Sequence, residues 1–173
     1  MVTQEKQLIF IHGTMGVGKS TVCAELQKQL TPSVYLDGDW CWKMEPFCPT
    51  EADKDMVIDN ITYLLRNFLR HTSLRYVIFG WVMHEERIVQ EVLDRLPDCS
   101  FDLHIFTLTC TEQALRQRLQ LDVEQGVRQE DVIARSLPRL ALYQPMPYTK
   151  IDVSERSAAQ AAEQIAALVR ATE

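Results

Sequence analysis

The sequence predicts a three-layer α/β/α fold, in which helices cover both faces of a five-stranded parallel sheet and a helical lid lies at one edge. Five short apolar runs alternate with segments of helical periodicity from end to end, an order typical of parallel sheets built from strand–helix–strand units. No repeat, low-complexity segment or flexible linker interrupts the alternation. The length of 173 residues suits one hydrophobic core, so we expect a single domain over residues 1–173.

The first half of the chain contains two predicted strands and two predicted helices. Residues 8–11 form a wholly apolar run, which favours a buried parallel strand. Apolar residues four apart then predict a helix over residues 19–30. A short strand is expected at residues 34–36, and the helical spacing of apolar residues returns over residues 58–69.

The second half repeats this alternation. Residues 76–79 predict the third strand, and a helix over residues 88–96 is closed by Pro97. Residues 103–108 and 150–153 predict the fourth and fifth strands.

Two helices are expected to start at capping boxes, in which a Ser or Thr and a Glu or Gln three residues later bond each other's main-chain N–H groups. Thr109 and Glu112 predict the start of a helix near residues 112–121. Ser157 and Gln160 predict the start of the Ala-rich C-terminal helix.

Composition and charge exclude several classes of protein. The net charge of -6 comes without a basic stripe, so we expect no nucleic-acid partner. The apolar run near the N-terminus is too short for a signal peptide or a membrane span. The five cysteines are scattered and show no CxxC spacing, so we expect reduced thiols in a cytoplasmic protein rather than zinc ligands or disulfides.

Residues 13–20 read GTMGVGKS and match the phosphate-loop pattern GxxxxGK[ST] in full. Between a strand and a helix, this pattern forms a nest of main-chain N–H groups for phosphate oxygens, and the helix adds the positive end of its dipole. Lys19 is expected to reach the β- and γ-phosphates of ATP, and Ser20 to bind Mg²⁺. The predicted ATP-binding residues of this segment are Gly13, Thr14, Met15, Gly16, Val17, Gly18, Lys19, Ser20 and Thr21.

Two carboxylates, Asp37 and Asp39, follow the second predicted strand. The carboxyl ends of parallel strands meet at one edge of the sheet, so we expect this pair beside the phosphate loop. In an extended chain the two side chains would share a face. One acid can then orient Mg²⁺-bound water while the other accepts a proton from the phosphoryl acceptor. The alternative is an Asx/Gly turn with solvated carboxylates.

A phosphate loop followed by a DxD-type acidic pair resembles the P-loop small-molecule kinases. This group includes shikimate, gluconate and adenylylsulfate kinases, chloramphenicol phosphotransferase and tunicamycin-resistance-like ATP-binding proteins. The resemblance implies the P-loop NTPase fold. It also implies that Asp39 binds and deprotonates the acceptor and that Asp37 lies near Mg²⁺, although the two roles could be exchanged.

Two departures from these families affect the metal site. Residues 76–81 lack the aspartate that many P-loop proteins carry after this strand, and Trp40 interrupts the DGDN pattern of adenylylsulfate kinases. We therefore expect Mg²⁺ to be held by Ser20, phosphate oxygens and waters that Asp37 orients. The missing acid and the absence of an NKxD sequence count against a GTPase switch or an ATP-driven motor.

Two long polar stretches, residues 44–56 and 122–136, follow strand ends. By the resemblance, residues 44–71 form an acceptor-binding helical segment and residues 122–136 form the lid. Arg118 matches the arginine that stacks on adenine, and Arg128 or Arg135 matches those that clamp the transferring phosphate. Such an arginine contributes about 10³–10⁵ in rate. Ordinary surface arginines on an amphipathic helix–loop–helix are the alternative.

Aromatic residues lie near the acidic pair in the sequence. Trp40 and Trp81 are expected to bind the acceptor together with Asp39, as the wall of a pocket for a ring-bearing or apolar molecule. Packing in the core explains these rings equally well. His84 is expected in the first turn of a helix rather than in catalysis.

These features predict an ATP- and Mg²⁺-dependent phosphotransferase that moves the γ-phosphoryl group to a hydroxyl of a small molecule. The predicted catalytic residues are Lys19, Asp37, Asp39, Arg128 and Arg135. The alternative is an ATP-binding protein that sequesters a ligand or antibiotic with little turnover. The sequence names neither the acceptor nor the oligomeric state.

Overall fold

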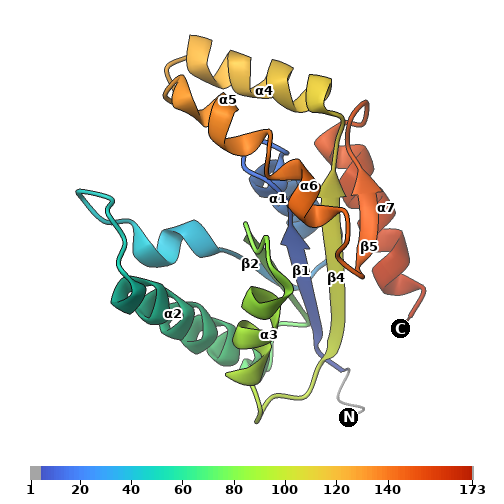
Figure 1. Ribbon diagram of the computed structural model, residues 1–173. Coiled ribbons are helices and arrows are strands. Elements are labelled where there is room, and N and C mark those ends of the chain that lie inside the picture. Colours follow the sequence, from blue (N-terminus) through green and yellow to red (C-terminus); the bar gives the residue numbers. More distant parts are fainter. Residues whose placement is uncertain (1–4, 173) are drawn as a thin grey trace.

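The computed structural model describes residues 5–172, in which strands and helices alternate along the chain (Figure 1). The elements are β1 (Gln7–His12), α1 (Lys19–Gln29), β2 (Ser33–Asp37), the 3-10 helix η1 (Gly38–Trp42), α2 (Glu51–Arg70), β3 (Tyr76–Trp81), α3 (Glu86–Asp94), β4 (Asp102–Thr109), α4 (Glu112–Glu124), α5 (Asp131–Ser136), α6 (Leu140–Tyr143), β5 (Thr149–Asp152) and α7 (Ala158–Arg170).

The five strands form one parallel sheet in the order β2–β3–β1–β4–β5. β1 lies in the middle, where Ile9 pairs with Ile78 of β3 and with His104 of β4. Helices α2 and α3 cover one face of the sheet, and α1 and α7 cover the other (Figure 1). The predicted three-layer α/β/α fold with a five-stranded parallel sheet is therefore confirmed.

Alternate residues of the central strand enter two separate hydrophobic cores. Ile9 and Ile11 pack with residues of α1 and α7, whereas Leu8 and Phe10 pack with residues of α2 and α3. All four side chains are fully buried. A strand that is covered on both faces has no polar face to show, which explains why it reads as an unbroken apolar run.

The starts of two helices test the predicted capping boxes. The box formed by Ser157 and Gln160 is confirmed at the start of α7. The predicted box at Thr109 and Glu112 is wrong, because Thr109 is the last residue of β4. The side chain of Thr111 caps α4 instead, by accepting a hydrogen bond from the main-chain N–H of Ala114.

Helix α2 begins well before the apolar spacing of residues 58–69 predicts it. Its first turn is fixed by a capping box between Thr50 and Asp53. Residues 51–56 are mostly exposed, so this part of the helix has no apolar periodicity and reads as a polar stretch. The polar stretch of residues 44–56 therefore includes the first turns of α2.

Helices α4, α5 and α6 gather beyond the carboxyl ends of β1 and β4 (Figure 1). Leu115 and Leu119 of α4 and Val132 of α5 are buried in a small core of their own. The predicted lid, residues 122–136, comprises the end of α4, the following loop and α5. Across residues 5–172, no helix combines the length and the apolar character needed to cross a membrane.

Candidate nucleotide-binding site

The phosphate loop joins β1 to α1 and contacts the lid. Its backbone has positive φ at Gly16 and Gly18, 82° and 106°, which glycine adopts without steric cost. A Cβ on Gly16 would lie 2.4 Å from the side chain of Leu119 in α4. The loop thus requires glycine both for its turn and for the close approach of α4. Loops of this shape at a helix N-terminus commonly bind anions.

Lys19 is held against the loop by its own main chain. Its Nζ donates hydrogen bonds to the carbonyl oxygens of Gly13 and Thr14 at 2.9 and 3.0 Å. Burial lowers the pKa of Lys19 to about 8, and the negative charges of Asp39 and Asp37 only partly oppose this effect. A phosphate group beside this amine would stabilise its protonated form.

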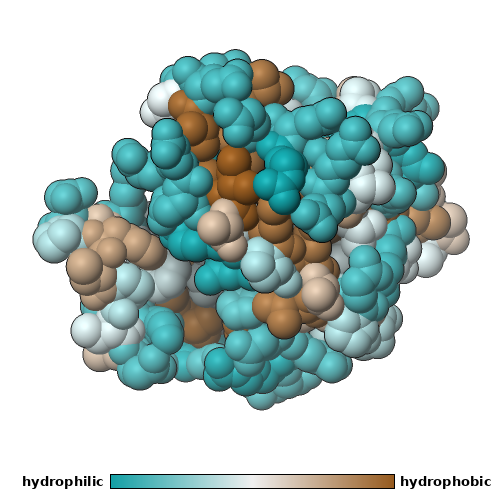
Figure 2. All heavy atoms as spheres, turned by 45° about the horizontal axis from the view of Figure 1, so that its top comes forward, coloured by the Kyte–Doolittle hydropathy of each residue, from teal (hydrophilic) through white to brown (hydrophobic). Residues whose placement is uncertain are grey.

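A cavity of about 520 Å³, named here the first cavity, opens in front of the loop. Its wall includes residues 15–22, both aspartates of the acidic pair, residues 80–82 and side chains of the lid. Seen toward the carboxyl ends of the strands, the molecule exposes apolar surface in a hollow bordered by hydrophilic side chains (Figure 2). Both the volume and the place at the strand ends are typical of ligand sites in α/β sheets.

Asp37, at the end of β2, uses both carboxylate oxygens in hydrogen bonds with the protein. Oδ2 accepts from the hydroxyls of Ser20 and Tyr35, at 2.9 Å each, and Oδ1 accepts from the main-chain N–H of Asp39 at 3.0 Å. Asp37 is thereby fixed against the start of α1. Tyr35 is absent from the predicted site, although its place two residues before Asp37 on one strand puts both side chains on the same face.

Asp39 lies in η1 and not in an extended strand, so the expectation that the two carboxylates share a face of an extended chain is wrong. The chain turns at Gly38, which packs so closely on the Trp81 ring that a Cβ would come within 2.4 Å of it. Oδ1 of Asp39 accepts a hydrogen bond from Nε1 of Trp81 at 3.1 Å. Asp39 is exposed and borders the first cavity. Asp37 and Asp39 therefore reach the same cavity through different geometry.

The oxygens of Ser20 and Asp37 fit a magnesium ion. Hydroxyl and carboxylate oxygens are the hard donors that Mg²⁺ prefers, and Mg²⁺ commonly takes its remaining ligands from phosphates and water. Within the described part of the chain, no group of three or more His, Cys, Asp or Glu side chains could hold a metal ion by itself.

Arg118 of α4 ties the phosphate loop to the end of the sheet. Its guanidinium group donates hydrogen bonds to the carbonyl oxygen of Val17 at 3.0 Å and to that of Val153 after β5. Arg156, which follows β5, also borders the first cavity. It is absent from the predicted residues, although its place just after the fifth strand puts it at the ligand-binding edge of the sheet.

The two lid arginines differ in position. Arg128 borders the first cavity and pairs with Asp122 at 2.9 Å, and its positive charge contributes to the lowered pKa of Lys19. Arg128 and Lys19 thus border the same cavity. Arg135 pairs with Asp131 on the exposed side of α5 and does not border the cavity.

A second cavity, of about 370 Å³, lies between α2 and α3. Trp81 and Val82, at the end of β3, border both cavities. Because the indole of Trp81 also donates to Asp39, this carboxylate lies beside the junction of the two cavities.

Besides Arg135, three predicted residues lie outside the walls of both cavities. Gly13 and Thr14 are buried at the start of the loop, where the Thr14 hydroxyl donates to the carbonyl oxygen of Ser136 at 3.1 Å and so joins the loop to α5. Trp40 is 62% exposed and packs against Tyr35. It borders neither cavity.

The chain is similar to one known protein family and to several solved structures. The family model described as AAA domain matches residues 9–136, from β1 through α5. A search of curated proteins finds no match.

Several solved structures share the fold over nearly the whole chain. A gluconokinase from Sinorhizobium meliloti is 16% identical, with a TM-score of 0.71 over 98% of this chain and 94% of that one. The tunicamycin resistance protein of Deinococcus radiodurans is 23% identical, with a TM-score of 0.68 over 95% of each chain. An APS kinase from Mycobacterium tuberculosis, solved with AMPPNP and APS, is 15% identical, with a TM-score of 0.68 over 96% and 98%. The expected fold of the P-loop kinases is therefore confirmed.

Proposed function

Because this chain belongs to the AAA domain family, we propose that it is an ATP-dependent phosphotransferase that moves the γ-phosphoryl group to a hydroxyl of a small molecule. The observation that carries the proposal is the position of Asp39, which borders the first cavity and bonds the tryptophan shared with the second. A base at this junction can take a proton from an acceptor in one cavity while the phosphates lie in the other.

ATP would occupy the first cavity, with its phosphates on the main chain of residues 16–20 and beside Lys19. Ser20, together with water on Asp37, would hold Mg²⁺, which would neutralise charge on the phosphate oxygens. Arg128 faces the same region from the lid and would stabilise the charge that spreads over the transferring group. Arg118 and Arg156, near the end of β5, would contact the nucleoside end.

The acceptor would occupy the second cavity, whose wall comprises Trp42, residues of α2 between 51 and 58, residues 81–85 and the start of α3. Asp39 is assigned as the base because its carboxylate is exposed at the junction, whereas both oxygens of Asp37 are engaged by the protein. Asp37 is the positioning residue, since it fixes Ser20 and the turn that carries Asp39.

Asp39→Asn tests this assignment. Asparagine keeps an oxygen that accepts the hydrogen bond from Trp81 but cannot take the acceptor proton. We expect kcat to fall by about 10²–10⁴, with the ATP affinity unchanged. Coupled ADP-release assays and calorimetric ATP titrations would measure the two quantities.

Asp98→Asn is the matched control, because Asp98 is exposed and borders neither cavity. Turnover by Asp39→Asn at the rate of this control would contradict the role of the base. ATP binding without ADP release, over a broad panel of alcohols, would instead favour a protein that sequesters its ligand.

A further inference from the structure

The second cavity has an apolar lining and two indole walls. Val57 and Ile58 of α2 and Met83 after β3 border it and are almost fully buried. The rings of Trp42 and Trp81 meet edge to face in its wall, with centroids 6.0 Å apart. Surfaces of this kind bind flat apolar groups.

Carboxylates outnumber basic side chains around this cavity. The acids in its wall are Glu51, Asp55, Glu85 and Glu91. The Lys and Arg side chains are Lys54 and Arg87, so with His84 counted as neutral the formal charge of the wall is −2, four acids less two bases. Each base already pairs with an acid of the wall, Lys54 with Glu51 and Arg87 with Glu85. Of the described residues in this wall, no Lys or Arg is left over to receive an anionic group.

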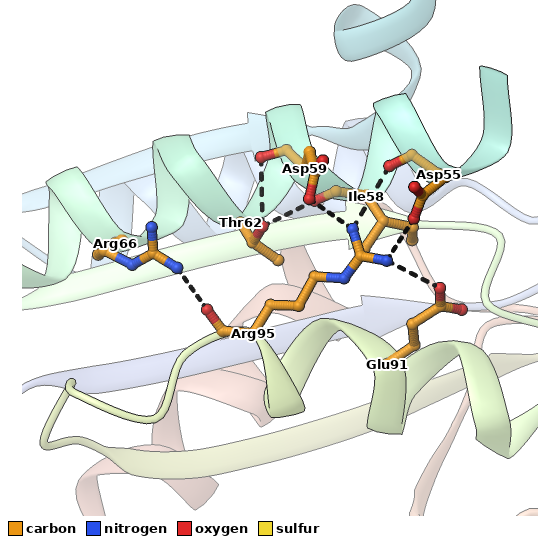
Figure 3. A network of polar contacts seen from close by, with 7 residues as sticks. All are labelled: Asp55, Ile58, Asp59, Thr62, Arg66, Glu91 and Arg95. Atoms are coloured by element: carbon orange, nitrogen blue, oxygen red, sulfur yellow. Dashed lines mark hydrogen bonds and ion pairs between the residues drawn. The ribbon is translucent and has the colours of Figure 1, made fainter. Parts of the chain in front are cut away.

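Arg95 offsets part of this charge from outside the cavity. Its guanidinium group lies between α2 and α3, where it pairs with Asp55 and Glu91 (Figure 3). Arg95 does not border the cavity itself. Adding the single positive charge of Arg95 to the −2 of the wall still leaves a formal charge of −1 around the cavity.

We propose that the phosphoryl acceptor is a neutral or amine-bearing alcohol with a flat apolar ring, and not an anionic sugar acid. This inference rests on the proposed function. The ring packs against Trp42 and Trp81, an ammonium group faces the acidic rim, and the hydroxyl passes Trp81 to reach Asp39. The hydroxyl oxygen bonds to the γ-phosphorus while the bond from that phosphorus to the β–γ bridging oxygen breaks. ADP leaves, and Asp39 takes the hydroxyl proton.

Three compounds with one phenol ring and different charges test this acceptor class. Tyramine carries an ammonium group, tyrosol is neutral, and 4-hydroxyphenylacetate carries a carboxylate. Their affinities are measured by calorimetry on the full chain, with and without a non-hydrolysable ATP analogue and Mg²⁺. We expect tyramine and tyrosol to bind at least about tenfold more tightly than 4-hydroxyphenylacetate.

Three variants locate the binding surface. Trp42→Ala should weaken tyramine binding about tenfold, because it removes one indole wall. Tyr63→Ala removes an exposed ring of α2 that borders neither cavity and should leave the affinity unchanged. Glu51→Lys, at a side chain that is 88% exposed and so outside the core, should lower the preference for tyramine over 4-hydroxyphenylacetate several-fold.

The acceptor class is overturned if 4-hydroxyphenylacetate binds as tightly as tyramine, if none of the three compounds binds, or if Glu51→Lys and Trp42→Ala both leave the affinities unchanged. The binding measurements do not depend on turnover. Compounds that bind in the expected order without ADP release would contradict phosphotransfer alone. ADP release with gluconate, but not with tyramine or tyrosol, would contradict the acceptor class alone.

Discussion

The amine of Lys19 makes nucleotide binding depend on pH. Its pKa is lowered to about 8 by burial, and bound phosphates would raise it again because they favour the charged form. Above pH 8 the free protein therefore loses a proton that the ATP complex retains, so binding must take up that proton. We expect the dissociation constant for ATP to rise above pH 8 by up to about tenfold per pH unit.

Calorimetric titrations at pH 7 and pH 9.5 would measure this effect, and repeating them in buffers of different ionisation enthalpy would count the protons taken up. Lys28→Ala, which removes an exposed lysine from the same helix, should show the same pH profile as the unmodified chain. Equal ATP affinity at the two pH values would show that Lys19 does not titrate in this range.

His12 is a residue whose role could not be predicted from the sequence. The residue is fully buried at the end of β1; Nδ1 donates to the carbonyl oxygen of Met83 at 2.8 Å, and Nε2 accepts from the hydroxyl of Thr107 at 2.7 Å. This tautomer follows from the carbonyl, which can only accept. Burial lowers the pKa of His12 to about 4, so the ring is neutral near pH 7. Both partners are distant in sequence, so no pattern in the chain indicates the role of His12.

At the scale of elements, one arginine joins the two helices that enclose the second cavity. Arg95, at the end of α3, pairs with Asp55 and Asp59 of α2 at 2.5 Å each and with Glu91 of its own helix at 3.3 Å (Figure 3). Arg66 of α2 donates to the carbonyl oxygen of Arg95 at 2.6 Å. The helices are therefore linked through both the side chain and the main chain of one residue.

Arg95→Ala should leave three carboxylates close together without their shared cation. We expect the free energy of unfolding to fall by about 1 kcal/mol at low salt, since exposed ion pairs contribute little unless they form a network. The loss should shrink at high salt. The KM for the acceptor should rise while the ATP affinity stays unchanged, because the second cavity, unlike the first, lies between the two helices.

Urea unfolding at two salt concentrations, together with steady-state kinetics, would measure these effects. Lys28→Ala is the control here as well, because it removes an isolated exposed pair with Glu25 and should cost less. A stability loss that is independent of salt would indicate packing rather than charge as the role of Arg95.

Elements could be predicted where burial imposes a pattern. The strands are apolar on both faces, so residues 8–11 and 76–79 are visible in the sequence as unbroken runs. The start of α2 could not be predicted from periodicity, because its first turns are exposed and its capping box uses Asp53 instead of Glu or Gln. The link through Arg95 could not be predicted either, since it depends on how closely α2 and α3 approach each other.

At the scale of the whole molecule, the parallel sheet explains why the site residues meet. The phosphate loop follows β1, Asp37 ends β2 with Asp39 two residues later, and Trp81 ends β3. Parallel strands place all of them at one edge of the sheet. This convergence could be predicted from the order of the elements. The separation of the two cavities by Trp81 could not, because it arises from the packing of Gly38 on the indole and from the bond to Asp39.

The same architecture predicts that ATP stabilises the entire chain. The first cavity takes its wall from the central strand's loop, from the lid and from the segment after β5, so the site exists only in the folded state. At an ATP concentration of about 100 times the dissociation constant, mass action adds about 2.7 kcal/mol to the free energy of unfolding. For a chain of 173 residues this corresponds to a rise in Tm of roughly 5–10 °C.

Thermal unfolding with ATP and Mg²⁺ would measure that rise in Tm, and chelation of Mg²⁺ should reduce it. Lys19→Ala should abolish the shift, because it removes the charge that faces the phosphates, whereas Lys28→Ala on the same helix should retain it. If Lys19→Ala kept the full shift, ATP would have to bind outside the phosphate loop. Because ATP would link the loop, the lid and the end of β5, the shift should appear as one cooperative transition of the whole domain.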